Sequence, residues 1–597
     1  MKTWYGALLS ASLILIVGCA TTPKPTESAS TSLRRLYDEY FEQQLKLSPL
    51  SATFLGDERY NDRLENPATL EFQRSFEALQ RRYLKRATAI RPDGLQGSER
   101  ISYDVFIRER EHALAGTRFP DWLLPIDQMD SIASTLAVLG SGAGAQPFRT
   151  VRDYDNFLQR AAGFVIWSRS AIAAMREGMH RGIVQPRVLM LKVVPQLRAL
   201  GVLDPRQSLF WEPVKSMPES FSTVERTRLE AAYADVLANK LLPAYRRLAD
   251  FIEREYLPAT RATVAWTALP DGAAWYNYRI ASRTTTHLTA DEIHALGLAE
   301  VARIRDDMEQ LRRELGFSGN LPAFFKYLQT DPRFVAPSAG ILLDDYRALK
   351  KRIDRLLPAM FADFPKADYE VREVEPFRAR SSPGAFYQPP SADGKRPGIF
   401  YINTFNLAAQ PIFGMETLSL HEASPGHHFQ ISIQQELTDL PRFRRFGGYT
   451  AYAEGWALYC ESIGKELGLF KDPYQWYGRL SDEMLRAMRL VVDTGLHAKG
   501  WTREQAIQYM RDNSSMAESD IEAEVERYIA WPGQALAYKV GQLRITAMRA
   551  HAEQMLGSKF GIKAFHSQIL RDGSLPLDVL EAKIERWIES VKSPHAP

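Results

Sequence analysis

Apolar residues recur at spacings of three and four along most of this chain, which is the pattern of helices that bury one face. Segment 222–256 shows the pattern clearly, with Leu229 and Val236 two turns apart. Pro243 should interrupt or kink that helix, because proline lacks the backbone N–H that an inner helical turn needs. No repeat is present and strands do not alternate with helices, so the pattern predicts a mainly α-helical protein.

Two further segments carry helix-start signals. Thr289 is followed three residues later by Glu292, and Thr502 by Gln505, which is the spacing of a capping box. The first of these helices is expected to run to about Leu315. Helices of this kind fill both halves of the chain.

The N-terminus has the features of an export signal. A basic start is followed by an apolar stretch over 5–17, which is too short to span a bilayer as a mature helix. Residues 16–19 (IVGC) resemble the cleavage site of bacterial lipoprotein signals, which implies that Cys19 becomes the lipidated first residue; a plain secretory signal is the alternative. Ala20 resembles outer-membrane sorting signals of Gram-negative bacteria, so we expect a membrane-anchored protein that faces the periplasm.

Composition divides the chain into three parts. Residues 1–19 form the lipoprotein signal, and residues 20–32 are small, polar and proline-containing, so we expect a flexible tether. The folded body is expected over 33–597, where no apolar run approaches membrane-spanning length. Cys460 would have no disulfide partner once Cys19 is lipidated.

The composition of the body is that of an ordinary globular protein, with 45% apolar and 25% charged residues in 597. This length exceeds what one small core serves, so we expect two lobes around a deep cleft. The net charge of +3 is nearly balanced, and no basic run is interleaved with aromatic residues. Nucleic acid is therefore not an expected partner.

Residues 421–428 (HEASPGHH) hold three of the eleven histidines beside a glutamate, which is the composition of a metal site. Two imidazoles reach one ion when they are four residues apart on a helix, but Pro425 occupies that position after His421. His427 and His428 follow His421 by six and seven positions, a rise of roughly 9 to 10.5 Å in a straight helix. No single zinc could bind both ends of such a span.

Pro425 and Gly426 suggest how the spacing is shortened. Proline breaks the hydrogen bonding of that turn and glycine tolerates unusual dihedrals, so the segment can bulge outward. If two residues loop out, His427 comes to the position of the second ligand. We therefore favour His427 over His428 as the ligand, and assign His428 to an orienting or substrate contact.

A catalytic zinc needs a third protein ligand. Segment 448–461 reads as an apolar helix that carries Glu454, and an acid in such a helix is costly unless it is paired. Glu454 is therefore the predicted third ligand. Glu461, seven residues later on the same face, either orients a ligand or faces solvent.

A turn-rich loop over 380–396 is followed by a plausible short strand over 398–404. In zinc peptidases an edge strand beside the metal helix commonly holds an extended substrate by backbone hydrogen bonds. We therefore predict substrate contacts at Tyr401 and Asn403. A purely structural hairpin is the alternative.

The pairing of HEASPGHH with AYAEGWALY (451–459), preceded by YINTFN (401–406), resembles the bacterial lipoproteins grouped as domain of unknown function 885. The resemblance runs from about residue 33 to the C-terminus. That group is similar in turn to helical zinc peptidases with a glutamate third ligand, such as thimet oligopeptidase, angiotensin-converting enzyme and the thermostable carboxypeptidases. The resemblance implies a large two-lobed helical body, a metal core over about 398–545 and one Zn²⁺ per chain.

The resemblance also implies a mechanism. Zinc acidifies water, and Glu422, next to a ligand, can take the proton as general base. A tyrosine or histidine would stabilise the developing oxyanion, and Tyr538 and His497 are the candidates. Asp493 lies four residues before His497 and could fix its tautomer.

Cationic residues near these donors could hold a substrate carboxylate. Arg489, Arg527 and Lys539 are the candidates, and such a contact would make the enzyme a carboxypeptidase.

We therefore expect a zinc-dependent hydrolase that cleaves short peptides in the cell envelope, as a carboxypeptidase or an oligopeptidase. One alternative is a zinc hydrolase of ester or non-peptide amide bonds. Another is an inactive lipoprotein that binds peptides or a partner protein.

Overall fold

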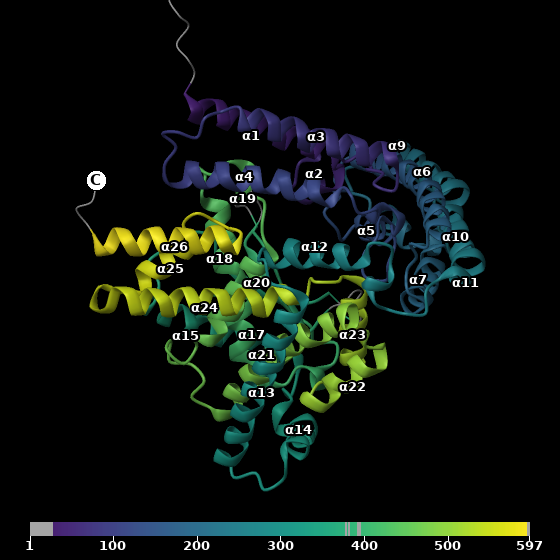
Figure 1. Ribbon diagram of the computed structural model, residues 1–597. Helices are drawn as coiled ribbons and strands as arrows, with labels where there is room; N and C mark the ends of the chain where they lie inside the picture. The colour runs from purple at the N-terminus through teal and green to yellow at the C-terminus, as the bar shows by residue number, and fades with distance from the viewer. Residues whose placement is uncertain (1–27, 376–378, 380–382, 391–395, 594–597) are drawn as a thin grey trace, which may run out of the picture.

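Helices make up most of the described chain, which in this computed structural model comprises residues 28–375, 379, 383–390 and 396–593. One three-stranded sheet accompanies them, and the predicted mainly α fold is thus confirmed (Figure 1). Cys19 lies outside the described residues. The first helix, α1, begins at Ala29 and is capped by Ser28, so the predicted tether ends about four residues too late. The signal for an earlier helix start was the apolar face of α1, which includes Leu33 and Leu36.

The N-terminal half is built from long antiparallel and crossing helices. In Figure 1 the purple helices α1, α3 and α4 lie side by side across the top, and α6, α7 and α10 form the arm on the right. Their bounds are α1 Ala29–Leu47, α2 Pro49–Phe54, α3 Leu70–Thr88, α4 Gly97–Gly116, α5 Ile132–Gly140, α6 Val151–Arg181, α7 Arg187–Leu200, α8 Glu212–Lys215, α9 Thr223–Val236, α10 Leu242–Phe251, α11 Leu257–Ala259 and α12 Gly272–Thr284.

The helical segment around Pro243 stays continuous. Two π-helical segments, Leu237–Leu241 and Ile252–Tyr256, connect α9 to α10 and α10 to α11. A π turn widens the helix by one residue, which absorbs the missing N–H of Pro243 without ending the element. The expected interruption therefore takes the form of a wider turn.

The remaining helices form the lower body and the C-terminal face. Both predicted capping boxes are present, with Thr289 at the start of α13 and Thr502 at the start of α22. The bounds are α13 Ala290–Glu314, α14 Leu321–Thr330, α15 Ala339–Leu356, α17 Met415–Glu422, α18 His427–Glu436, α19 Arg442–Arg445, α20 Thr450–Ser462, α21 Pro473–Ala498, α22 Arg503–Asn513, α23 Glu518–Ala530, α24 Leu536–Leu556, α25 Ile562–Leu570 and α26 Leu577–Lys592.

Buried apolar residues of the described chain form three large clusters. The first joins α1 and α4 to the C-terminal helices α25 and α26, so the two ends of the chain share a core. The second lies mainly in the N-terminal half, and the third joins α13 and α14 to α21, α22 and α23. No described helix is long and apolar enough to cross a membrane.

The sheet consists of β1 (Tyr369–Glu373), β2 (Ala385–Gln388) and β3 (Gly398–Ile402), in the order β1-β3-β2. The predicted strand is present as β3, but it is the central strand, parallel to β1 and antiparallel to β2. Both of its edges are paired, so the prediction that this strand offers an open edge to substrate is wrong. β1 and β2 are the two edge strands of this sheet, and β2 packs against α17 and α18.

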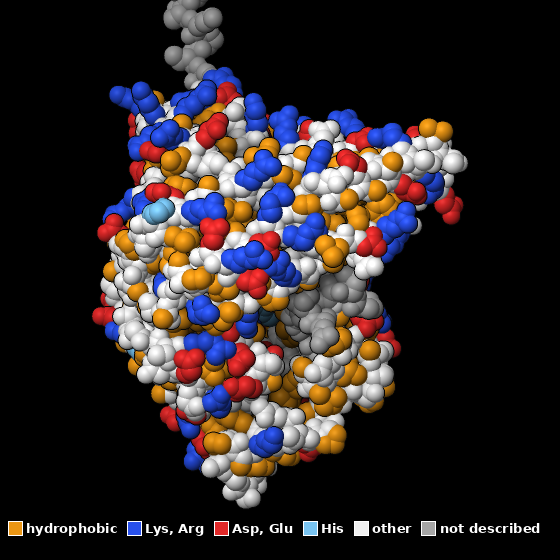
Figure 2. Space-filling view, turned by 90° about the vertical axis from the view of Figure 1, so that its right-hand side faces the viewer, with side chains coloured by type: hydrophobic (Ala, Val, Ile, Leu, Met, Phe, Trp, Pro, Cys, Tyr) orange, Lys and Arg blue, Asp and Glu red, His pale blue; other side chains and the backbone are white. Residues whose placement is uncertain are grey.

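Helices α20 and α24 approach each other closely. A Cβ on Gly541 would lie 1.9 Å from the carbonyl oxygen of Ala451 and 2.8 Å from Cα of Gly455. This contact requires glycine at both positions, because a Cβ on either would clash. It brings α24 directly against α20, the helix that carries Glu454. Figure 2 shows acidic and basic side chains interspersed over one face, which is hollowed near its middle beside the residues drawn in grey.

Candidate functional site

The histidine motif lies on two helices. α17 ends at Glu422, directly after His421, and α18 begins with His427. The four residues between them, 423–426, form a turn that brings the two histidines close together. Their imidazole centroids lie 4.8 Å apart. We expected a two-residue bulge in one helix, and the chain instead ends one helix and starts another.

Gly426 and Pro425 explain this turn. A Cβ at position 426 would lie 1.9 Å from the carbonyl oxygen of His421 and 2.4 Å from that of Leu420, so a side chain is excluded there. The Pro425 carbonyl accepts a hydrogen bond from Trp456 Nε1 at 2.8 Å. The start of α18 is therefore held against the end of α17, and Trp456 fixes the turn to α20.

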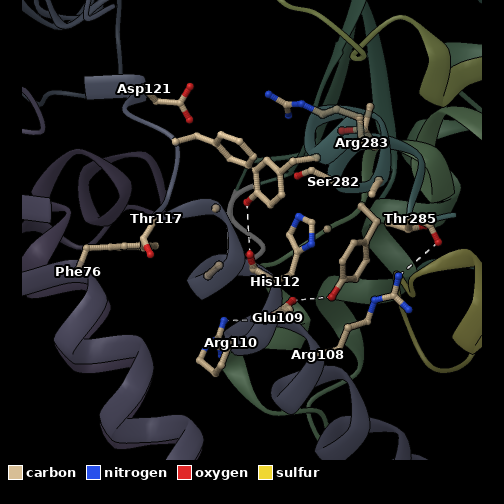
Figure 3. Close-up of a pocket in the computed structure, with 18 of the residues that line it drawn as sticks. Phe76, Arg108, Glu109, Arg110, His112, Thr117, Asp121, Ser282, Arg283 and Thr285 are labelled. Atoms are coloured by element: carbon tan, nitrogen blue, oxygen red, sulfur yellow. Dashed lines mark hydrogen bonds and ion pairs between the residues drawn. The ribbon is translucent and has the colours of Figure 1, made fainter. Parts of the chain in front are cut away.

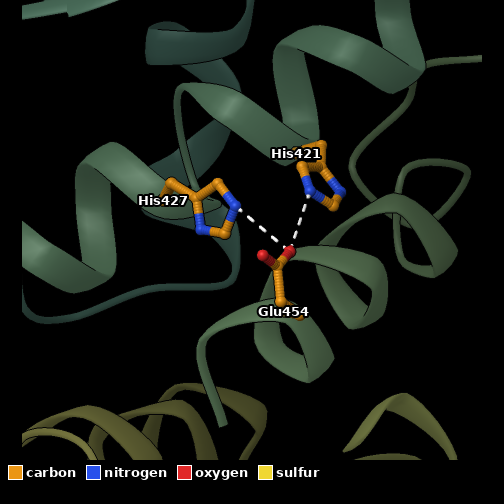
Figure 4. A group of neighbouring side chains, drawn as sticks. All are labelled: His421, His427 and Glu454. Atoms are coloured by element: carbon orange, nitrogen blue, oxygen red, sulfur yellow. Dashed lines mark ion pairs between the residues drawn. The ribbon is translucent and has the colours of Figure 1, made fainter. Parts of the chain in front are cut away.

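The turn brings His421, His427 and Glu454 together (Figure 4). Nε2 of each histidine lies 3.4 Å from Oε2 of Glu454, and no two of the three ligand atoms are more than 4.8 Å apart. The side chains of His421, His427 and Glu454 are 5%, 14% and 18% exposed, so a small molecule can reach the group from one side.

This donor set fits a tetrahedral cation. Two donors bound at about 2.1 Å to a tetrahedral ion lie about 3.4 Å apart, which is the separation between Glu454 and each histidine. Oε2 of Glu454 is buried and accepts no hydrogen bond from any described residue, so a cation would satisfy it. Burial raises the pKa of Glu454, but His427 and His421 outweigh it and hold that pKa well below its usual value.

Glu461 orients one of the imidazoles. Nδ1 of His421 donates to Oε1 of Glu461 at 2.7 Å, and Glu461 is 1% exposed. This bond leaves Nε2 as the atom that faces Glu454, and so decides between the two roles left open for Glu461. Burial lowers the pKa of His421, but Glu454 and Glu461 raise it to about 10. The position therefore favours positive charge, which a divalent cation would supply.

Glu422 adjoins the three side chains from the end of α17. It is half-buried, and its carboxylate forms no hydrogen bond or ion pair with the rest of the described chain. Burial raises the pKa of Glu422, while His421 and His427 lower it and Glu454 raises it again. The balance is a raised pKa, so this carboxylate accepts a proton more readily than an exposed glutamate.

Residues 49–584 match the family described as "Bacterial protein of unknown function (DUF885)". The chain belongs to this family. No curated protein matches the chain in sequence.

Two solved structures have a similar fold. A "putative lipoprotein" from Colwellia psychrerythraea is 29% identical with a TM-score of 0.87, over 94% of this chain and 100% of that one. A "putative lipoprotein of unknown function" from Shewanella oneidensis is 19% identical with a TM-score of 0.73, over 92% of this chain and 99% of that one. The description of the Colwellia psychrerythraea protein agrees with the lipid anchor predicted from the N-terminus.

His428 of this DUF885 member points away from the triad. Its Nδ1 accepts a hydrogen bond from the Tyr387 hydroxyl at 2.8 Å, and its ring lies 4.7 Å from that of Tyr369. It is 2% exposed, and burial lowers its pKa to about 4. The predicted substrate contact is therefore corrected: His428 is a neutral ring that joins α18 to β2.

Tyr401 and Asn403 are also turned into the protein. Tyr401 is 5% exposed and stacks on Phe386 with ring centroids 4.9 Å apart. Asn403 is 8% exposed and its Nδ2 donates to the carbonyl oxygen of Ala379 at 2.7 Å. Both side chains shape the sheet and the loop beside it, which corrects the prediction that they contact substrate.

His497 and Asp493 do not pair with each other. His497 is fully buried, with Nε2 donating to the carbonyl oxygen of Tyr528 at 2.9 Å and Nδ1 accepting from the N–H of Trp266 at 3.3 Å. Asp493 instead accepts from the Tyr276 hydroxyl at 2.6 Å. Both ring nitrogens of His497 are occupied by backbone, so the predicted oxyanion donor is corrected to a structural histidine.

Tyr538 lies on α24, which packs against α20, the helix that carries Glu454. Burial raises its pKa, and the charge of Glu454 raises it further while Arg489 and Arg527 lower it. The guanidinium carbon of Arg489 lies 4.4 Å from the centroid of the Tyr538 ring. Tyr538 and Arg489 thus pack against each other, one from α24 and one from α21.

Lys539 is directed elsewhere. It is fully buried, and Nζ contacts Glu483 at 2.6 Å, Gln542 at 2.8 Å and Glu300 at 3.0 Å. These contacts use all three ammonium protons. The prediction that Lys539 holds a substrate carboxylate is therefore corrected.

Two residues near the site were missed by the sequence reasoning. Arg486 precedes Arg489 by one turn, and its charge acts on the pKa of Glu422. Tyr387 fixes β2 to His428. The i, i+3 spacing of the arginines was a usable signal, whereas Tyr387 lies in a turn-rich segment whose pairing is not visible in the sequence.

A cavity of about 480 Å³ lies away from the triad, between α3, α4, α12 and the start of α20 (Figure 3). Its wall includes Arg108, His112, Asp121 and Arg283, and the hydroxyl of Tyr449 donates to Glu109 at 2.6 Å there. None of the three triad residues lines it.

Proposed function

We propose that this protein is a zinc-dependent hydrolase that cleaves peptide bonds of short peptides at the cell envelope. The observation that carries the proposal is the convergence of His421, His427 and Glu454 at tetrahedral spacing, with an unpaired carboxylate one residue after the first histidine. Histidine nitrogen and glutamate oxygen are the donors that zinc prefers in catalytic sites.

The three side chains would hold one Zn²⁺ per chain, and the fourth position would remain open on the exposed side. When bound, zinc would act as a Lewis acid, which polarises a carbonyl and lowers the pKa of water towards neutral pH. Glu461 keeps Nε2 of His421 directed inward through the 2.7 Å hydrogen bond to Nδ1. The turn at Gly426 keeps His427 in reach of the same point.

Glu422 is the general base in this proposal. Its carboxylate takes the proton of the attacking water and then delivers it to the leaving amine nitrogen. The hydroxyl of the water becomes part of the new carboxyl group, so one water is consumed for each bond. Tyr538 donates a hydrogen bond to the carbonyl oxygen as negative charge develops there.

The open edge of β2 supports a peptide as substrate. The N–H of Asn403 donates to the carbonyl oxygen of Gly384 at 2.9 Å, and this fixes the hydrogen-bonding phase of β2 against β3. The backbone groups of Ala385 and Tyr387 must then point away from β3. Among the described residues nothing bonds to them, so an extended peptide can pair with this edge.

The test uses purified protein in three forms. Wild type is expected to contain about one zinc per chain and to cleave members of a mixed peptide pool, measured by elemental analysis and mass spectrometry. Glu422→Gln keeps the zinc and loses at least about 100-fold in turnover, because the ligands remain while the base is gone. His421→Ala loses the zinc.

Glu466→Gln is the matched control, since this acid is 49% exposed and, among the described residues, pairs with Arg549 alone. It should retain both zinc and turnover. Cleavage by Glu422→Gln at the wild-type rate would refute the mechanism. A folded wild type that binds no metal would refute the proposal as a whole, and cleavage of esters but not peptides would change the bond class.

A further inference from the structure

An arginine beside the triad has an incomplete set of hydrogen bonds. Nε and Nη2 of Arg489 donate to Oε2 of Glu524 at 3.2 and 3.0 Å, and Nε also contacts the Tyr528 hydroxyl at 3.2 Å. Nη1 is buried and bonds to no described residue. Arg489 is only 6% exposed. A buried charged donor without a partner is uncommon in native proteins, so this atom is suited to a ligand.

Arg486 shows the same feature one turn earlier on α21. Nη1 of Arg486 donates to the Asp482 carboxylate at 2.9 Å, whereas Nε is buried and bonds to no residue in the described part of the chain. Its side chain is 12% exposed. Positions 486 and 489 are neighbours on one helical face, so both guanidinium groups border the same space.

The arginines of this group outnumber the carboxylates that pair with them. Arg486 pairs with Asp482, and both Arg489 and Arg527 contact the single carboxylate of Glu524. Within these ion pairs three guanidinium groups share two carboxylates, and Glu422, on whose pKa the charge of Arg486 acts, is a further acid near the group. Glu454 and Glu461 also lie near, but their oxygens face His421 in the metal site.

Tyr538 connects this group to the metal ligands. The guanidinium carbon of Arg489 lies 4.4 Å from the centre of its ring. Tyr538 lies on α24, which packs closely against α20, the helix of Glu454, where Gly541 meets Gly455. The phenol therefore lies against Arg489, on a helix that packs against the one carrying Glu454.

We propose that Arg489, assisted by Arg486, binds the terminal carboxylate of a peptide whose last amide bond lies at the triad. The substrate class is then peptides with a free C-terminus, and the reaction releases C-terminal residues. This inference rests on the proposed function. A planar carboxylate matches a donor edge of a guanidinium group, whereas the ammonium of Lys539, which follows Tyr538 on α24, is already paired with Glu483 and Gln542.

The experiment separates binding from turnover. Glu422→Gln is expected to bind peptide but to turn it over at least about 100-fold more slowly, so a peptide acid and the same peptide with a C-terminal amide can be titrated into it by calorimetry. We expect the acid to bind at least about 10-fold more tightly than the amide. Combining Glu422→Gln with Arg489→Lys should abolish that preference, because lysine can still pair with Glu524 but cannot also present a second donor edge.

Arg527→Lys is the matched control in the same background. Arg527 shares Glu524, but its Nη1 and Nη2 already bond Gln534 and Glu524 at 2.6 and 2.8 Å. It should keep the acid preference. Circular dichroism and thermal melting establish that each variant is folded, and Arg489→Met with Glu524→Gln removes the pair together if Arg489→Lys does not fold.

Each outcome bears on a different claim. Equal binding of acid and amide by the Glu422→Gln protein overturns the inference, as does an equal loss for both ligands in Arg489→Lys. If wild type cleaves internal bonds of amidated peptides as fast as terminal ones, the inference fails while the hydrolase proposal stands. If no metal binds and no peptide is cleaved, the hydrolase proposal itself fails.

Discussion

Lys539 and Arg489 are both cations buried beside carboxylates, yet their surroundings differ. All three protons of Lys539 are used by Glu483, Gln542 and Glu300. In Arg489, Nε and Nη2 donate to Glu524, whereas Nη1 has no partner in the described chain. The comparison teaches that a buried cation is a candidate for ligand binding only when its donors exceed its protein partners. By that measure Lys539 has a structural role, and Arg489 is suited to bind an anion.

The largest expected effect is a loss of stability when Lys539, whose three ammonium protons all have partners, is replaced. Lys539→Met removes the ammonium that compensates Glu483 and Glu300, and should lower the free energy of unfolding by about 3–5 kcal/mol. Urea denaturation measures this. Arg544→Met on the same helix is the control, since its contact with Glu581 is exposed and 3.7 Å long, and it should change stability by less than about 1 kcal/mol. Equal losses in both variants would remove the distinction.

Asp493 sharpens the comparison, because it is a buried charge on α21 with no cation in contact. Burial raises its pKa to about 7, although Tyr276 and Gly533 donate hydrogen bonds to it. The folded state therefore holds the proton more tightly than the unfolded state, where the pKa is about 3.9. The contribution of Asp493 is greatest below about pH 4 and falls as pH rises towards 7, by up to about 4 kcal/mol.

Asp493→Asn stays neutral at every pH, so the stability of this variant relative to wild type should increase between pH 4 and pH 7. Denaturation curves across that range test the sign. The absolute curve of wild type also contains acids such as Glu483, whose pKa lies near 2 despite burial because Arg479 and Lys539 lower it. The difference between the two proteins removes that background, and a constant difference would show that Asp493 is ionised throughout.

The smallest effect on stability is expected at Tyr538. Tyr538→Phe keeps the ring against Arg489, so the free energy of unfolding should change by less than about 1 kcal/mol. Turnover should fall about 10- to 100-fold if the hydroxyl stabilises the oxyanion.

Tyr528→Phe is the control for Tyr538→Phe, because its hydroxyl bonds Arg489 and Glu524. It should cost about 1 kcal/mol of stability and leave turnover unchanged. Unchanged turnover in Tyr538→Phe would exclude the hydroxyl from the chemistry.

Features set by local chemistry were predictable from the sequence. The capping boxes at Thr289 and Thr502 and the helical periodicity depend on neighbouring residues and are present. The strand predicted over 398–404 is also present, over 398–402. The grouping of His421, His427 and Glu454 was also predictable, because buried ionisable groups in apolar segments need partners and few were available.

Features set by long-range packing were not predictable. The central position of β3 depends on pairing with β1, which lies about thirty residues earlier. The orientation of His497 depends on Trp266, 231 residues away in sequence. Pattern reasoning could find the chemistry-bearing residues, but which way Lys539, His428 and His497 point is decided by elements that no local pattern reveals.

The break between α17 and α18 has a consequence for how the protein would respond to metal. A single helix would present both imidazoles on a rigid rod, whereas here the three donors come from α17, α18 and α20. A bound cation would therefore act as a cross-link between separate elements, and its binding energy would add to the stability of their mutual packing. Chelation should then loosen tertiary structure, so that melting temperature rises with the free concentration of the ion. Substitutions far from the ligands that shift any one of these helices would be felt as altered metal affinity.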